Sequence, residues 1–133
     1  MLTLIFTIFI SNTNAASLIR LDKYSIEEVT PFSHKYELII EDNCAYCLNQ
    51  LSILKECVDE KDVIVLLDNK AKLSEEKLQR IVKRKKISFK TYILSEELKK
   101  IYDFKSITPM MWINKLEERK FFTGVVLCRE LKR

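Results

Sequence analysis

The side chains of this sequence best suited to chemistry are its cysteines, Cys44, Cys47, Cys57 and Cys128. The first two have the C-x-x-C spacing that occurs in redox-active dithiols and in half of a zinc site. A structural zinc ion takes four ligands, and His34 is the single histidine of the chain. An all-cysteine zinc site would have to recruit Cys57 and Cys128, which lack a partner at the usual short spacing. The pattern therefore favours thiol–disulfide chemistry at Cys44 and Cys47.

The C-x-x-C pair is expected where a strand ends and a helix begins. Residues 36–40 form an apolar, β-branched run typical of a strand. Apolar residues recur at helical spacing after the pair, at Leu48, Leu51, Leu54 and Val58. At a helix start, unpaired N–H groups and the positive end of the helix dipole favour a thiolate over a thiol. We therefore predict that Cys44 is the nucleophile and that Cys47, one turn on, resolves the mixed disulfide. A fixed disulfide that closes a small loop is the alternative.

The rest of the chain alternates strands and helices. Apolar runs at residues 63–67, 89–94 and 110–113 predict strands, the first of them central and buried on both faces. Ser74 and Ser95 can cap the two helices that intervene. The inward-facing side chains are expected to be Leu78, Ile81 and Val82 in the first helix and Leu98, Ile101 and Tyr102 in the second. Because this alternation requires crossover connections, the chain is predicted to have an α/β fold.

Two backbone positions near the end of the chain also carry information. Pro109 follows Thr108 at the start of the strand 110–113, where an X–Pro bond can be cis at low cost and leave neighbouring backbone groups exposed. An ordinary trans turn proline is the alternative. Gly124, the only glycine, is expected at a positive φ or where a side chain would clash.

The first residues indicate export. Residues 1–10 are almost entirely apolar and carry no charged side chain, and a small polar stretch, 11–16, follows. This pattern predicts a signal peptide, residues 1–15, and a mature domain of residues 16–133. The apolar run is shorter than the about 20 residues that cross a bilayer, so stable membrane insertion is not expected. Export would place the cysteines where disulfides persist, and the periplasm is the expected location in a bacterium. The alternative is a buried first element or a misassigned start.

Charge and length limit the other classes of function. The chain has 133 residues, the size of about one domain, and its net charge of +4 gives little reason to expect a nucleic-acid binder. The basic run at residues 83–86 ends a predicted helix, where cations suit the helix dipole. It is therefore interpreted as a solvated helix end rather than as a nucleic-acid or lipid patch.

From residue 36 to the C-terminus, these features resemble the thioredoxin-like fold, an α/β fold with a central mixed β-sheet flanked by helices. The matching pieces are the strand and helix around Cys44, the stretch 97–109, which looks like the family's segment before its cis-proline, and Gly124 before a last helix. The extra helix and strand at residues 74–94 are similar to the insertion of the TlpA and ResA branch of exported thiol-disulfide oxidoreductases. Residues 21–29 would then form that branch's N-terminal hairpin or turn.

The resemblance implies roles for a few residues. Cys44 would be the attacking thiolate, Cys47 the resolving thiol, and Thr108 with Pro109 the backbone shelf that pairs with an extended substrate peptide. Tyr46 would contact substrate from the rim of the site or donate a hydrogen bond near the sulfurs. The resemblance implies no cofactor and no metal. It implies cysteine-containing exported proteins as substrates and a membrane protein as electron donor.

Several positions differ from the family's pattern. Asn43 stands where a tryptophan usually precedes the first cysteine, and Leu38 stands where thioredoxin has a buried acid. Gln50 replaces an acidic residue that the cytochrome-maturation reductases often carry. Ala45 and Tyr46 bring no cation to the sulfurs, whereas strongly oxidising relatives place a histidine there, so a reductant or an isomerase-like exchanger is expected.

The remaining two cysteines are expected to be buried or half-buried thiols. A disulfide between Cys57 and Cys128 is the alternative, if their segments pack on one face of the sheet. For the whole protein, one alternative function is a noncatalytic thioredoxin-like interaction module with a structural disulfide. A copper metallochaperone is a further alternative, although such carriers generally need another histidine near the cis-proline.

Overall fold

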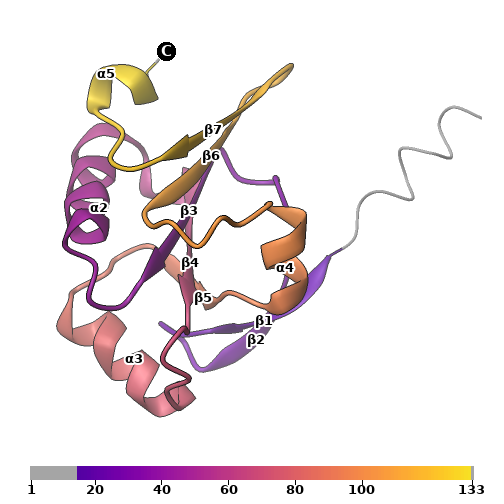
Figure 1. Cartoon of the computed structure of the whole chain (residues 1–133), viewed down its shortest axis with the longest axis vertical. Helices are drawn as coiled ribbons and strands as arrows, with labels where there is room; N and C mark the ends of the chain where they lie inside the picture. The colour runs from indigo at the N-terminus through magenta and orange to yellow at the C-terminus, as the bar shows by residue number, and fades with distance from the viewer. Residues whose placement is uncertain (1–14, 133) are drawn as a thin grey trace, which may run out of the picture.

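The computed structural model describes residues 15–132, which are built around a seven-stranded mixed β-sheet (Figure 1). The strands lie in the order β2-β1-β5-β4-β3-β6-β7. Their bounds are Ala16–Arg20 for β1, Ser25–Val29 for β2, Tyr36–Glu41 for β3, Val63–Asp68 for β4, Lys90–Ile93 for β5, Met110–Asn114 for β6 and Arg119–Thr123 for β7. The strands β3, β4 and β5 run parallel, and the other pairs are antiparallel. Except for Ala15, the predicted signal peptide lies outside the described residues.

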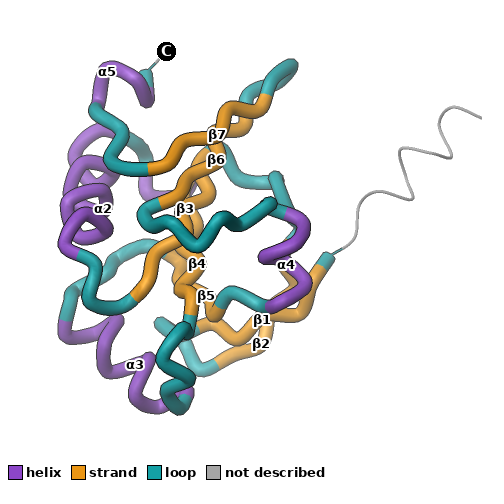
Figure 2. Tube along the Cα trace, in the orientation of Figure 1, coloured by secondary structure: helices purple, strands orange, loops and turns teal. Residues whose placement is uncertain are grey.

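The helices are divided between the two faces of this sheet (Figure 2). Their bounds are Ala45–Cys57 for α2, Glu75–Arg84 for α3, Glu96–Ile101 for α4, Cys128–Leu131 for α5 and Glu60–Asp62 for the short 3-10 helix η1. Helices α2, α3 and α5 pack on the face to which β3 presents Leu38 and Ile40. Helix α4 packs on the opposite face, with Ile39. Because successive side chains of a strand alternate between faces, β3 and β4 are apolar almost throughout.

The N-terminal hairpin and the inserted helix and strand are both present. Strands β1 and β2 form an antiparallel hairpin over residues 16–29, which begins earlier than the predicted 21–29. The insertion predicted at residues 74–94 is α3 followed by β5. Strand β5 pairs with β4 on one side and, through Tyr92 and Arg20, with β1 on the other. The insertion therefore connects the hairpin to the rest of the sheet.

Both predicted serine caps are confirmed. Ser74 Oγ and Ser95 Oγ each accept a hydrogen bond from the backbone N–H three residues on. Ile101, predicted to face inward, is instead 37% exposed, and Leu48, one of the apolar residues at helical spacing, is 41% exposed. For Leu48 the reason is the orientation of α2, whose buried stripe consists of Cys47, Gln50, Leu51 and Leu54 and leaves Leu48 beside it.

Cys57 and Cys128 form a disulfide, so the expectation that they are thiols is wrong. Cys57 is the last residue of α2 and Cys128 the first of α5. Both helices lie on the same face of the sheet (Figure 1), and the two Cα atoms are 5.7 Å apart. That separation is within the range that a disulfide spans. Nothing local in the sequence predicts a contact between residues 71 positions apart.

No helix within residues 15–132 is long and apolar enough to span a bilayer.

Candidate redox site

Cys44 and Cys47 form a disulfide at the first turn of α2. The turn from β3 into α2 passes through Asn43, whose φ of 60° is one that asparagine tolerates better than most residues. Cys44 is the N-cap of the helix, and its Sγ accepts a hydrogen bond from the backbone N–H of Cys47 at 3.2 Å. The predicted position at a strand-to-helix turn is therefore confirmed. This sulfur lies where the helix start stabilises negative charge.

The two sulfurs differ in accessibility. Cys44 is half-buried, whereas Cys47 is only 2% exposed and belongs to the core under α2. A disulfide in another protein can reach Cys44 from solvent but cannot reach Cys47 without displacing part of that core. Cys44 is thus the accessible cysteine of the pair, and Cys47 is the protected one.

Thr108 and Pro109 lie next to Cys44 although they are more than 60 residues away in the chain. The Thr108–Pro109 peptide bond is cis. Thr108 Oγ1 donates a hydrogen bond to Cys44 Sγ at 3.6 Å, and the Thr108 carbonyl oxygen is 3.7 Å from the same sulfur. Pro109 O accepts a hydrogen bond from the N–H of Gly124 at 2.8 Å, and Gly124 has a φ of +83°. The segments before β6 and after β7 therefore meet beside the redox pair.

Tyr46 and Ile107 give the rim of the site an apolar surface. Tyr46 is 68% exposed and Ile107 54% exposed. The cavity next to the cysteines measures only about 10 Å³. A much larger hollow, about 840 Å³, lies around Tyr36 and Cys57 at the other end of α2. The redox pair thus opens on a surface that a peptide can cover, not in a pocket for a small molecule.

No ionisable side chain occupies either of the two positions at which relatives carry an acid. Leu38 is fully buried in the apolar core under α2. Gln50 is also fully buried, and both ends of its amide are occupied by the backbone of Val126. The nearby carboxylate of Asp42 pairs with Lys85 at 2.9 Å, and the hydrogen bond from Lys85 lowers the pKa of Asp42. Asp42 is therefore held ionised and is a poor proton acceptor.

A buried acid that the sequence analysis did not identify is Glu37. Its carboxylate accepts hydrogen bonds from Tyr102 Oη and from three nitrogens, Phe32 N at 3.1 Å, His34 N at 3.2 Å and Asn114 Nδ2 at 2.8 Å. Burial raises the pKa of Glu37, and these hydrogen bonds oppose the rise. Burial and the adjacent Glu37 carboxylate also raise the pKa of Tyr102. The sequence did contain a sign of this site, because an acid inside an apolar strand that is buried on both faces needs hydrogen-bond partners.

Glu37 lies away from the redox site and has a structural role. It points to the face opposite α2, at the start of β3, whereas Cys44 follows the end of that strand. Its partners connect the loop before β3 to α4 and β6.

In residues 15–132, no group of three or more histidine, cysteine, aspartate or glutamate side chains is arranged to hold a metal ion.

Neither a family model nor a curated protein matches this sequence, whereas solved structures do. The pneumococcal exposed lipoprotein thioredoxin from Streptococcus pneumoniae is 19% identical, with 90% of this chain and 96% of that chain covered and a TM-score of 0.66. StoA from Bacillus subtilis is 16% identical over 90% and 95% of the two chains, with a TM-score of 0.63. A thiol:disulfide interchange protein of the thioredoxin family from Chlorobium tepidum is 10% identical over 90% and 89%, with a TM-score of 0.60. The expected thioredoxin-like α/β fold is confirmed.

Proposed function

We propose that this protein is a thiol-disulfide oxidoreductase of the cell envelope that reduces or exchanges disulfides of exported proteins through Cys44 and Cys47. The observation that carries the proposal is the arrangement of an accessible Cys44 at the helix N-cap, a buried Cys47 one turn on and Thr108 Oγ1 next to the first sulfur. The similar structures named above include a lipoprotein thioredoxin and a thiol:disulfide interchange protein, which supports the same chemistry.

In the reducing direction, the Cys44 thiolate attacks one sulfur of a substrate disulfide. A Cys44–substrate disulfide forms, the substrate S–S bond breaks, and its second sulfur leaves as a thiolate. The Cys47 N–H and Thr108 Oγ1 are the donors that stabilise the attacking thiolate. Cys47, as a thiolate, then attacks Cys44 Sγ. The Cys44–Cys47 disulfide forms, the first substrate sulfur leaves as a thiolate, and the substrate has gained two electrons.

The proton of Cys47 needs an acceptor before the second step. Leu38 has no basic atom, and the amide of Gln50 is occupied at both ends by Val126. The thiolate released from the substrate in the first step is a base that the reaction itself supplies. Transfer of the Cys47 proton to that sulfur supplies one of the two protons of the reduced substrate. Solvent, which took the proton of Cys44 when its thiolate formed, supplies the other, so the reaction balances without an acid behind the site.

Peptide recognition is assigned to Tyr46, Thr108 and Pro109. The backbone around Thr108 and Pro109 offers an edge on which an extended peptide can lie beside Cys44. Exposed Tyr46 would contact the substrate from the rim of the site.

The proposed location is the envelope, which is the periplasm in a bacterium with two membranes. It rests on the predicted signal peptide, residues 1–15, and on the likeness to an exposed lipoprotein thioredoxin. Electrons would then have to come from a membrane protein, because the reducing pools of the cytosol do not reach that compartment.

The deciding experiment is the equilibrium of the Cys44–Cys47 pair with a glutathione or dithiothreitol redox buffer. Alkylation followed by peptide mapping separates this pair from Cys57–Cys128, and Cys44→Ser is the control. A potential near about −270 mV supports a reductase, whereas about −120 mV would make the protein a disulfide donor instead. A pair that does not equilibrate would favour the interaction module with a fixed disulfide and contradict the enzyme.

A further inference from the structure

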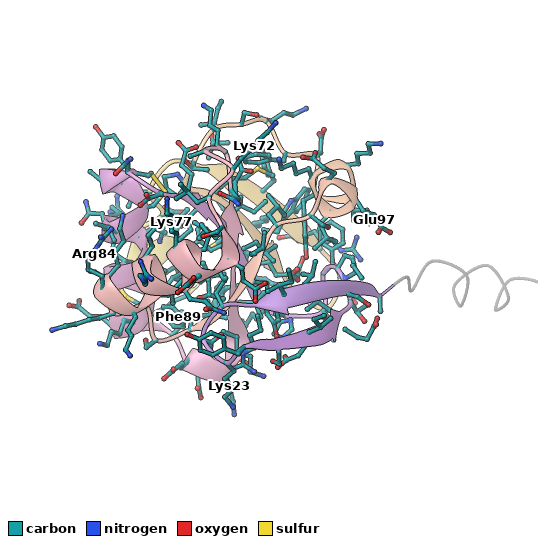
Figure 3. The ribbon with its side chains drawn as sticks, turned by 90° about the horizontal axis from the view of Figure 1, so that it is seen from below. Lys23, Lys72, Lys77, Arg84, Phe89 and Glu97 are labelled. Carbon is teal, nitrogen blue, oxygen red and sulfur yellow. A yellow bond between two sulfur atoms is a disulfide. The ribbon has the colours of Figure 1, made fainter. Side chains whose placement is uncertain are left out.

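Two hollows lie on either side of Lys86, just after the C-terminal end of α3. The first has a volume of about 240 Å³ and lies between α2 and the segment that follows α3. The second, of about 420 Å³, lies between α3 and the β1–β2 hairpin. Lys86 and Ile87 line both hollows, so the two form one continuous surface, which we call the Lys86 surface. In Figure 3, labelled Arg84, Phe89 and Lys23 mark the end of α3, the residue before β5 and the turn of the hairpin along this side of the molecule.

The floors of both hollows are apolar. Buried Leu51 and Phe89 line the first hollow, and buried Leu21 and Val82 line the second. Each hollow is large enough to accept one or two apolar side chains from a partner. A concave, apolar floor is a feature that fits inserted side chains rather than a flat layer of lipid headgroups.

The charges around these floors are almost all positive. Lys55, Lys85 and Lys86 line the first hollow, with no acidic residue among its lining side chains. Lys83 and Lys86 line the second hollow, and its one acid, Asp22, is paired with Arg20 at 2.9 Å. Of the lysines, Lys85 is paired with Asp42.

Three of these lysines have no acidic partner within residues 15–132. Lys55, Lys83 and Lys86 are exposed, and none makes an ion pair within the described part of the chain. The basic run interpreted from the sequence as a solvated helix end thus borders apolar hollows.

The Lys86 surface is continuous with the redox pair. Leu48, whose exposure the sequence analysis did not predict, lines the first hollow and is the residue after Cys47. Leu48, Lys85 and Ile87 also line the small cavity beside Cys44 and Cys47, together with the acids Glu41 and Asp42. A protein bound with its disulfide at Cys44 can therefore extend across Leu48 onto the first hollow.

We infer that the Lys86 surface binds an acidic segment of a partner protein, with apolar side chains in the two hollows and carboxylates on Lys55, Lys83 and Lys86. The inference rests on the proposed function for its biological role, because it defines the class of protein that the redox pair meets. Its binding test is independent of that function. The charges would accelerate association and select among disulfide-containing proteins, in addition to stabilising the complex.

The test uses a fluorescein-labelled peptide of leucines and glutamates that contains no cysteine. Its binding to the oxidised protein is followed by fluorescence anisotropy at about 0.01 M and about 0.15 M salt, where the Debye lengths are about 30 Å and 8 Å. A peptide with glutamine in place of each glutamate is the matched probe. We expect the acidic peptide to bind, more weakly at the higher salt concentration, and the neutral peptide not to bind measurably.

Two double variants show where the peptide binds. Lys55→Gln with Lys86→Gln is expected to weaken binding about three- to tenfold, as removal of two exposed charge contacts should. The control is Lys100→Gln with Lys115→Gln, two lysines away from this surface that also make no ion pair within residues 15–132. An equal loss of peptide affinity in both double variants, or no binding of the acidic peptide to the wild-type protein, would overturn the inference. Vesicles of phosphatidylglycerol that bind and are released by Lys55→Gln with Lys86→Gln, while the peptide does not bind, would assign the surface to lipid instead.

Reduction of a neutral peptide disulfide by the reduced protein is measured in parallel. If this reaction is absent while the acidic peptide binds, the proposed function fails and the docking surface stands. If the reaction occurs and no acidic preference is found, the docking surface fails and the proposed function stands.

Discussion

Gln50 on the redox helix is hydrogen-bonded through both ends of its side-chain amide to the backbone of Val126. The Val126 N–H donates to Oε1 at 2.5 Å, and Nε2 donates to the Val126 carbonyl at 3.1 Å. Together with the Cys57–Cys128 disulfide, this contact attaches the C-terminal segment to α2 at two points. The redox helix is therefore fixed to a segment that follows the last strand in sequence.

Gln50→Glu tests the two-sided contact. An ionised carboxylate still accepts from the Val126 N–H but leaves the Val126 carbonyl without a donor, so we expect a loss of about 1–3 kcal/mol in the free energy of unfolding. Burial should raise the pKa of the new acid, and its protonated form can donate to the carbonyl. Urea unfolding should therefore show a smaller loss at acidic than at alkaline pH. A loss independent of pH would argue against this geometry.

Thr108→Val tests the donor next to Cys44. Valine keeps the shape of threonine but cannot donate the hydrogen bond to Sγ seen at 3.6 Å. We expect the pKa of Cys44 in the reduced protein to rise by about one unit. A hydrogen bond to a charged group contributes about 1.5–3 kcal/mol, and one pKa unit corresponds to about 1.4 kcal/mol. Thiolate absorbance against pH measures this change. Thr30→Val, away from the site, should leave the titration unchanged.

Glu37→Gln tests the buried acid. Four groups direct donors at the carboxyl oxygens of Glu37, and the NH₂ group of glutamine would face one of these donors, so we expect a loss of about 1–3 kcal/mol of stability.

The pH dependence of that loss has a defined sign. The folded-state pKa of Glu37 is raised above the ordinary value of 4.5. The stability that wild-type Glu37 contributes is thus fully present below that value and declines as the pH rises through the folded-state pKa. Urea unfolding should show a larger difference between wild type and Glu37→Gln near pH 4 than near pH 8. The opposite trend would show that the folded state favours the ionised form.

Cys57→Ser with Cys128→Ser tests the second disulfide. It closes a loop of 71 residues, for which the chain-entropy relation predicts a stabilisation of about 4 kcal/mol. The same relation predicts only about 2 kcal/mol for the Cys44–Cys47 loop, so Cys44→Ser with Cys47→Ser is the matched comparison. Urea unfolding followed by Trp112 fluorescence measures both. A double variant at Cys57 and Cys128 that unfolds like wild type would show that this bond does not form in solution.

Most of the elements around the redox pair could be predicted from local patterns. The apolar runs of β3, β4 and β6, the caps at Ser74 and Ser95, and the C-x-x-C at a helix start are all short-range features. Each depends on alternation, helical periodicity or a capping side chain within a few residues. These features were sufficient for the order of elements and for the thioredoxin-like fold.

What the sequence could not provide depends on contacts between distant segments. The Cys57–Cys128 disulfide and the amide pair of Gln50 with Val126 each join residues more than 70 positions apart, whereas the place of Thr108 in the redox site was expected only from the resemblance to the thioredoxin-like fold. The exposure of Leu48 depends on which stripe of α2 meets the sheet, and the partners of Glu37 depend on the loop before β3 meeting α4 and β6. Local periodicity specifies which elements form, but the packing of those elements decides which side chains meet, because one apolar stripe is compatible with several orientations.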